Sequence, residues 1–218
     1  MNEQLKNARK ERGWTQHQAA KRLGVTQAYL SMIEKGTRHP ASLARKLMQV
    51  YGFSPTALPV CDVRVNPTPD FLANELASFG YPGFAHLPKV KKVNPADFLL
   101  MALAQKNLEA RVAEGLPWVV LQYPDMPVEF LVREARANNL QNRLGFVVTL
   151  GQRAAGRRDL QQLEQSLADS KLAKEDSFCK ELNEPERQWL REHSSKEAKE
   201  WNLLSDLRPE TLRYVAEA

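Results

Sequence analysis

Two threonine–glutamine pairs stand close together near the start of the chain. Thr15-Gln16 and Thr26-Gln27 lie eleven positions apart in the stretch TQHQAAKRLGVTQAYLSMIEKG. A threonine hydroxyl can accept a hydrogen bond from an unpaired backbone N–H group at the start of a helix. A glutamine amide both donates and accepts, so it can bond to phosphate oxygens or to the edge of an adenine. The pairs therefore indicate two consecutive helices, each beginning with a residue suited to nucleic-acid contact.

The residues around the two pairs predict three short helices. Apolar spacing favours helices over residues 3–12, 16–23 and 27–35. Their inward-facing residues are expected to be Leu5, Ala8, Ala19, Ala20, Leu23, Leu30 and Ile33. The glycines expected to end them are Gly13, Gly24 and Gly36. Two short helices joined by a tight turn that contains glycine form a helix-turn-helix.

The charge of the chain is divided unequally. Residues 1–58 contain ten Lys or Arg and three Asp or Glu, which gives +7. Residues 59–218 contain the remaining 21 basic and 23 acidic residues, which gives −2. This asymmetry indicates a polyanionic partner for the N-terminal part and not for the rest.

A longer stretch, LKNARKERGWTQHQAAKRLGVTQAYLSMIEKG, resembles the helix-turn-helix domain of the Cro and phage-repressor family, often called XRE-type. The following HPASLARKLMQVYGFSPTALP is similar to that family's fourth and fifth helices, with Ser54 capping the last. The matching residues are Gly13, Thr15, Gln16, Ala20, Gly24, Val25, Thr26, Gln27, Leu30, Ile33, Glu34 and Gly36. The resemblance implies a five-helix bundle over residues 1–59 whose third helix enters the major groove of double-stranded DNA.

The resemblance also implies two sets of contacts to DNA. The residues expected to face base edges are Gln27, Ala28, Tyr29 and Met32. The residues expected to contact phosphates are Arg9, Gln16, Thr26, Lys35 and Arg38. Met32 departs from the pattern, because family members often have a polar residue there.

The remainder of the chain reads as a linker followed by a second, all-α domain. Residues 60–69 belong to a proline-rich stretch and are predicted to be the linker, with a short extended segment at 60–65. Residues 70–218 predict about seven to nine helices. Helix starts are expected at Thr68-Pro69, at Asn94-Pro95, at the capping box of residues 183–186 and near Pro209.

Some segments of this second domain allow sharper expectations. Gly115 and Pro117 indicate a junction. The β-branched residues of the WVVLQY that follows allow a strand, although its position between helical segments favours a helix. Residues 157–176 form a polar helix with a leucine stripe, which fits either a solvated helix with a narrow core seam or a short dimerisation arm. A helix pair is expected around residues 138–139. Trp118, Trp189 and Trp201 are expected to be core anchors.

A search for reactive constellations finds none. The two cysteines, Cys61 and Cys179, are far apart and have no CxxC pattern or nearby histidine cluster, which disfavours structural zinc and a disulfide framework. The sequence contains no P-loop, HExxH, GxSxG or glycine-rich nucleotide motif. No apolar segment is long enough to cross a membrane, and the N-terminus lacks a signal peptide's apolar core. We therefore expect a cytoplasmic protein that is not an enzyme and has no metal or cofactor.

Two functions from different classes fit these observations. The first is a sequence-specific transcriptional regulator that acts as a homodimer on a palindromic operator, with repression expected. The second is an antitoxin that represses its own operon and neutralises a partner toxin through the helical domain. A small-molecule effector site in that domain is a further alternative, for which no convergent polar residues are evident.

Overall fold

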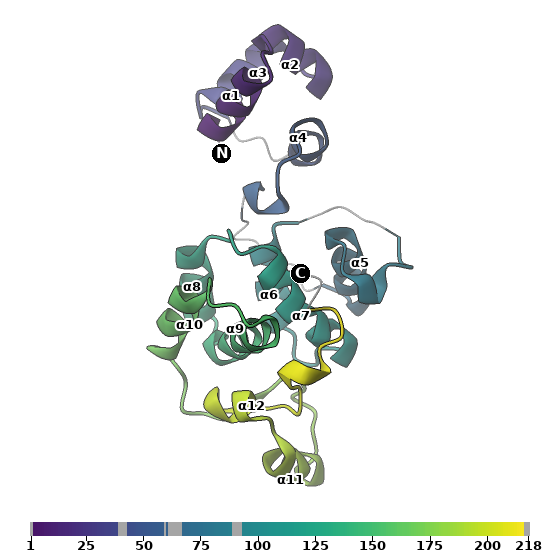
Figure 1. Ribbon diagram of the computed structural model, residues 1–218, viewed down its shortest axis with the longest axis vertical. Helices are drawn as coiled ribbons and strands as arrows, with labels where there is room; N and C mark the ends of the chain where they lie inside the picture. Colours follow the sequence, from purple (N-terminus) through teal and green to yellow (C-terminus); the bar gives the residue numbers. More distant parts are fainter. Residues whose placement is uncertain (1, 39–42, 59, 61–66, 89–92, 216–218) are drawn as a thin grey trace. The chain divides into compact units, whose positions relative to one another are not determined.

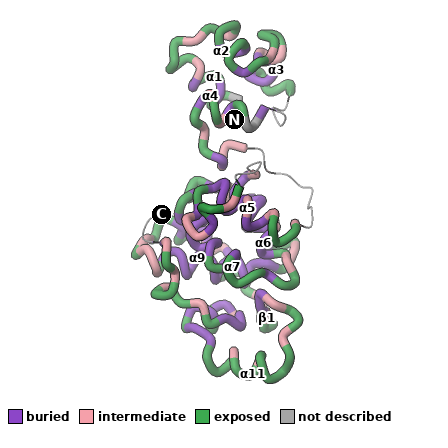
Figure 2. Tube along the Cα trace, turned by 90° about the vertical axis from the view of Figure 1, so that its right-hand side faces the viewer, coloured by how far each residue is buried: buried purple, intermediate pink, exposed green. Residues whose placement is uncertain are grey.

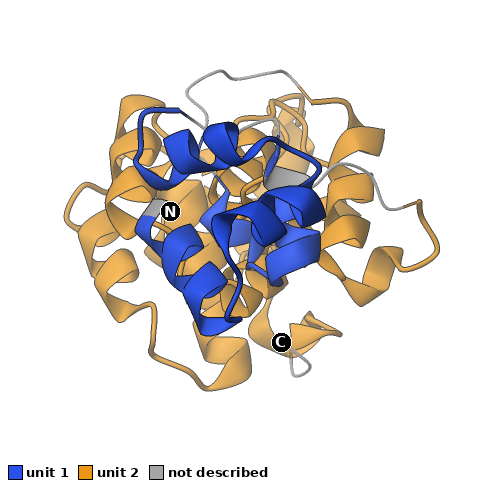
Figure 3. Cartoon of the chain, turned by 90° about the horizontal axis from the view of Figure 1, so that it is seen from above, with its two compact units in different colours: residues 1–60 blue, residues 61–218 orange. Residues whose placement is uncertain are grey.

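The computed structural model describes residues 2–38, 43–58, 60, 67–88 and 93–215. Its contacts divide the chain into two compact units, Met1–Val60 and Cys61–Ala218, here called the N-terminal and C-terminal units (Figure 3). Both units are helical, so the predicted all-α class is confirmed (Figure 1). The expected extended segment at 60–65 falls almost wholly outside the described residues.

The first four helices of the N-terminal unit are those that the sequence predicts. Its elements are α1 (Asn2–Glu11), α2 (Gln16–Leu23), α3 (Gln27–Glu34), α4 (Ala44–Tyr51) and the 3-10 helix η2 (Pro55–Ala57). The fifth element is a single 3-10 turn and not an α-helix. Ser54 caps it as expected, but Leu58 precedes a proline and is extended, which ends the turn after three residues.

The two threonines act as helix caps, as their spacing predicts. The hydroxyl of Thr15 accepts from the backbone N–H of Gln18 at 3.2 Å, and the Gln18 side chain returns a bond to the Thr15 N–H. The hydroxyl of Thr26 accepts from the backbone N–H of Tyr29, also at 3.2 Å. Gly24, between the two helices, has a φ of +66°, a left-handed conformation that other residues rarely adopt. The two threonine caps and the left-handed glycine together explain the tight turn between α2 and α3.

The core of the N-terminal unit is built from the faces expected to point inward. Leu5 and Ala8 of α1 pack with Leu30 and Ile33 of α3, and all four side chains are buried. The other buried members are Ala19, Ala20, Leu23, Leu43, Leu47 and Tyr51. Trp14 is half-buried against this cluster. Burial of one face on each helix leaves the opposite face of α3 at the surface.

The C-terminal unit contains eight α-helices and one short strand pair among its described residues. Its helices are α5 (Pro69–Phe79), α6 (Pro95–Leu103), α7 (Ala110–Gln122), α8 (Val128–Ala137), α9 (Gln141–Ala155), α10 (Gln161–Ala168), α11 (Glu184–His193) and α12 (Lys196–Glu200). Its shorter elements are the 3-10 helices η3 (Pro82–Phe84) and η4 (Pro209–Thr211) and the parallel strands β1 (Asp176–Ser177) and β2 (Leu203–Leu204). The last expected helix, near Pro209, is therefore only a 3-10 turn.

Helix α9 forms the centre of this unit. Every residue from Gln141 to Gln152 is buried, and buried residues are purple in Figure 2. Helices α7, α8, α10 and α12 pack around α9 (Figure 1). The ring of Trp201 lies against Gly145 so closely that a side chain at that glycine would collide with it. The indole N–H of Trp201 donates to the hydroxyl of Thr149 at 2.8 Å. Because Gly145 has no side chain, the ring of Trp201 can pack directly against the backbone of α9.

The predicted junction at Gly115 and Pro117 is wrong. Helix α7 runs through both residues and includes the WVVLQ part of the next segment, which confirms the helical expectation there. Gly115 lies beneath the side chains of Leu76 and Tyr81, and the Pro117 carbonyl contacts Gly151 on α9. The free energy gained by burying α7 between its neighbours outweighs the lower helix propensity of a glycine and a proline.

Two further expectations for this unit need correction. The polar helix predicted over 157–176 is limited to α10, whose Leu163 and Leu167 are buried against the rest of the unit, so they do not form an exposed dimerisation arm. Trp118 and Trp201 are buried as expected, but Trp189 is 50% exposed. Trp189 lies on α11, none of whose residues is buried, so the unit supplies no core for it to fill.

Candidate nucleic-acid interface

The exposed face of α3 carries most of the residues expected to contact bases. Gln27, Ala28 and Met32 are exposed, whereas Leu30 and Ile33 on the opposite face are buried. Met32 and Trp189 are the exposed large hydrophobic residues among those that the structure describes. Tyr29 is half-buried, because part of its ring packs against the core of the unit. The helix thus presents one amide, one methyl group and one thioether on a single surface.

Glu34, at the end of α3, is the centre of a buried polar cluster. Its carboxylate accepts from Nε and Nη2 of Arg9 at 2.6 and 3.0 Å, and from Nε2 of Gln16 at 2.9 Å. The side chain of Glu34 is 3% exposed. Arg9 also donates to the carbonyl of Trp14 at 2.9 Å. The cluster ties α1 and the start of α2 to the end of α3.

The electrostatics of this cluster favour the charged pair. Burial raises the pKa of Glu34, but the hydrogen bonds from Arg9 and Gln16 outweigh burial and hold that pKa below its ordinary value. The hydrogen bond to Glu34 in turn raises the pKa of Arg9. Both groups therefore stay ionised at neutral pH.

The cluster changes how two of the expected phosphate contacts are placed. The Arg9 guanidinium is directed into the unit, where Nε, Nη1 and Nη2 all donate to internal acceptors. Gln16 is half-buried, and its amide nitrogen donates to Glu34. The Arg9 guanidinium is therefore engaged inside the unit, whereas Gln16 keeps its backbone N–H and the second hydrogen of its amide nitrogen as donors for a phosphate.

The other expected phosphate contacts lie at the surface beside α3. Thr26, Lys35 and Arg38 are exposed. The guanidinium of Arg38 stacks over the ring of Tyr29, 5.1 Å from its centroid. This stacking holds a long basic side chain beside the exposed face of α3.

A second group of basic and aromatic residues was not identified from the sequence. Arg22 stacks over Trp14 at 4.3 Å, and Trp14 lies 5.5 Å from the ring of Tyr51. Arg12 donates to the carbonyls of Ala8 and Tyr51 at 3.0 and 2.7 Å. These contacts join residues up to 39 positions apart, so the spacing of neighbouring residues in the sequence could not predict them.

The described residues offer little for other kinds of chemistry. No group of three or more His, Cys, Asp or Glu side chains within the described ranges is arranged to hold a metal ion. Burial raises the pKa of Tyr81 and of Tyr123 to about 12, which suits neither for proton transfer near neutral pH. The helices of the described part are all too short or too polar to span a membrane.

Comparison with known families identifies only the N-terminal unit. Residues 5–58 match the family model described as Helix-turn-helix, and this match includes α2, the Gly24 turn and α3. No curated protein and no solved structure matches the chain. The C-terminal unit therefore stays without a recognised relative, whereas residues 5–58 form a DNA-binding helix-turn-helix domain of the XRE family.

Proposed function

We propose that the protein is a sequence-specific transcriptional repressor that binds a palindromic operator as a homodimer. The observation that carries the proposal is the exposure of Gln27, Ala28 and Met32 on one face of α3, within a unit of net charge +7. In helix-turn-helix proteins the second helix of the motif lies in the major groove, with its N-terminal residues at the base edges. Here that helix is α3.

Each exposed side chain suggests a partner on the base edges. The Gln27 amide can bond bidentately to N6 and N7 of adenine. The methyl group of Ala28 and the thioether of Met32 suit contact with thymine methyl groups. We therefore infer an operator half-site that contains A·T pairs opposite the start of α3. Tyr29, which is partly packed into the core, contributes through its exposed part.

Phosphate contacts would fix the register of α3 on the duplex. Lys35 and Arg38 supply charge beside α3, and Thr26 and the backbone N–H groups that follow it supply donors at the helix N-terminus. Gln16 lies at the N-terminus of α2, where its backbone N–H suits the same role. Such contacts release counterions, so the affinity should fall steeply with salt.

The dimer is inferred from the small size of the reading surface. One eight-residue helix contacts too few bases for useful specificity, and paired half-sites one helical turn apart solve this problem. The C-terminal unit, with a net charge near zero, is the part available for dimerisation or sensing. Repression would follow if the operator overlaps the promoter, because the bound dimer would occlude it.

A second function, that of an antitoxin, would add a toxin partner to the same DNA-binding activity. The observation that favours a protein partner is the half-exposed Trp189 on α11, which forms a contiguous apolar surface with Leu182, Pro185 and Leu190, since such patches mark interaction sites. Co-purification of a protein encoded beside this chain, with loss of that protein's toxicity, would support the antitoxin.

Fluorescence anisotropy on DNA from the protein's own promoter tests the first proposal. With about 6–10 phosphate contacts, the affinity should fall roughly 10³–10⁵-fold between about 50 and 200 mM salt. Gln27→Ala should weaken specific binding by about 1–3 kcal/mol and leave non-specific binding nearly unchanged. Gln4→Ala, an exposed glutamine on α1, is the matched control. Weak binding that is equal on every sequence and indifferent to Gln27 would contradict the proposal.

A further inference from the structure

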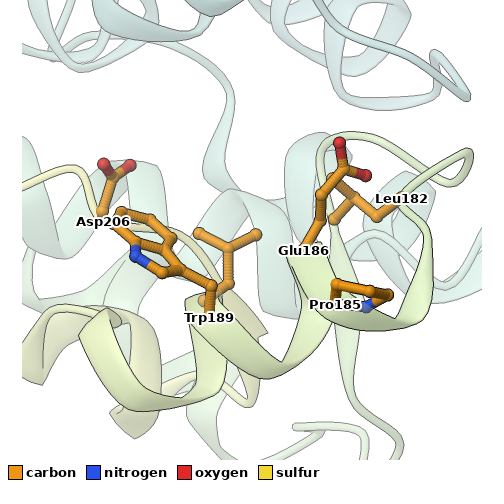
Figure 4. A pocket seen from close by; sticks show the side chains of 6 residues that line it. Leu182, Pro185, Glu186, Trp189 and Asp206 are labelled. Carbon is orange, nitrogen blue, oxygen red and sulfur yellow. The ribbon is translucent and has the colours of Figure 1, made fainter.

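Helix α11 forms one wall of a shallow groove on the C-terminal unit. The groove has a volume of about 480 Å³ and is lined by Leu182, Pro185, Glu186, Trp189, Leu190 and Asp206 (Figure 4). The helix itself is held by a capping box, in which Asn183 and Glu186 bond reciprocally at 2.9 Å. No residue of α11 is buried, so its groove-lining side chains Pro185, Trp189 and Leu190 all remain at least partly accessible.

Trp189 offers one face of its indole to this groove. The ring of His193 stacks against Trp189 with a centroid distance of 4.4 Å and an interplanar angle of 11°. A flat ring stacked on one side leaves only its other face for a ligand. Trp189 is itself one of the residues that line the groove (Figure 4).

The charges at the groove are of one sign. Glu186 and Asp206 lie on opposite sides of Trp189, and they are the charged side chains among the six described residues that line the groove (Figure 4). One oxygen of Glu186 accepts from the Asn183 N–H. Within the described part of the chain, the Asp206 carboxylate has neither a hydrogen bond nor an ion pair.

The nearby arginines do not neutralise these two carboxylates. Arg191 is already paired with Glu175 at 3.1 Å and with Glu184 at 2.8 Å. The guanidinium of Arg187 donates to the backbone carbonyls of Leu182 and Lys180, at 3.3 and 3.4 Å. The groove therefore combines an aromatic face, an apolar floor and uncompensated negative charge.

We propose that this groove is a docking site for a segment of a partner protein that presents an arginine between apolar side chains. An arginine guanidinium is planar and weakly hydrated, so it stacks on an indole face and bonds to carboxylates at its edge. The flanking apolar side chains would cover Leu182, Pro185 and Leu190. The site goes beyond DNA binding and does not depend on it.

The test uses the full chain and two synthetic peptides, acetyl-Leu-Arg-Leu-amide and acetyl-Leu-Gln-Leu-amide. The indole N–H resonance of Trp189 is followed by ¹⁵N NMR and assigned with Trp189→Phe, and the other three tryptophans serve as internal references. The arginine peptide should shift the Trp189 resonance in a saturable manner. The glutamine peptide should bind at least about fivefold more weakly than the arginine peptide.

A pair of variants separates charge from shape. Glu186→Gln with Asp206→Asn removes both charges, and glutamine can still accept from the Asn183 N–H, so the capping box survives. This double variant should weaken the arginine peptide about fivefold. Glu181→Gln with Glu210→Gln, which neutralises two exposed acids outside the groove lining, is the control and should change nothing.

Other results overturn the proposal. Equal shifts by both peptides, or full binding to the Glu186→Gln/Asp206→Asn variant, would show an apolar patch without charge selection. A Trp189 shift that follows protein concentration without peptide would show that a second copy of the chain covers the groove. No shift by the arginine peptide at about 10 mM would rule out the recognition chemistry itself.

Discussion

The guanidinium of Arg9 and the carboxylate of Glu34 form two hydrogen bonds, at 2.6 and 3.0 Å, across 25 positions of sequence. The pair joins the first helix to the last residue of α3, the helix proposed to read DNA. Gln16 adds a third bond to the same carboxylate. The orientation of the reading helix therefore rests on a buried ion pair as well as on apolar packing.

Glu34→Ala should destabilise the N-terminal unit by about 3 kcal/mol, because it leaves the Arg9 charge largely buried without a partner. Hydrogen exchange of the α1 and α3 amides, followed by mass spectrometry, should report the loss locally. Glu3→Ala, which removes an exposed acid from α1, is the control and should change exchange little. Unchanged protection of α3 in Glu34→Ala would show that the pair contributes nothing to stability.

The stability of the N-terminal unit should also depend on pH through Glu34. Its folded pKa lies below the ordinary value of 4.5, so its contribution is present above that value and is lost as the pH falls through the folded pKa. Hydrogen exchange of α3, measured from about pH 7 to about pH 3 and corrected for the intrinsic exchange rate, should show this decline. Glu34→Gln should have a flatter profile in that acidic range; an identical slope would contradict the assignment.

Arg38→Ala should weaken DNA binding about equally on all sequences and reduce the slope of log affinity against log salt by about 0.9. The reason is that a phosphate contact carries charge but no base information. Anisotropy titrations on operator and on unrelated DNA measure both quantities. Arg133→Ala, an exposed arginine of the C-terminal unit, is the control. A loss confined to the operator would instead give Arg38 a base contact.

Gly145→Ala should destabilise the C-terminal unit by about 1–3 kcal/mol, because the added methyl group would occupy the space of the Trp201 ring. Urea unfolding followed by tryptophan fluorescence measures this change. Ala155→Ser, at the end of the same helix, should have little effect. Wild-type stability in Gly145→Ala would mean that Trp201 can move aside without cost.

The helix-turn-helix could be predicted almost residue by residue, because its determinants are local. Thr15 and Thr26 cap the helices, and Gly24 allows the turn. The same reasoning found the capping box of α11 and the starts of α5 and α6. It failed at Pro117, where packing against α9 decides the outcome in place of local preference.

The features that local reasoning missed are long-range polar contacts. Arg143 is 2% exposed and bonds to Asp176, 33 positions away, and to the carbonyls of Leu103 and Gln105. The β1–β2 pairing joins residues 176 and 203 in the same way. In the candidate interface, the exposed residues of α3 followed from helical periodicity. The inward turn of Arg9 did not, because its partner Glu34 lies on another helix.

The arrangement of α3 has a consequence for how operator preference can diversify. The residues that hold the helix, Leu30, Ile33 and Glu34, alternate along it with the residues that face outward, Gln27, Ala28 and Met32. None of the outward set belongs to the buried core of the unit, so relatives of this protein could acquire new target sites without repacking that core. A designer who wishes to redirect it should vary these three positions and leave the Arg9–Glu34–Gln16 cluster intact.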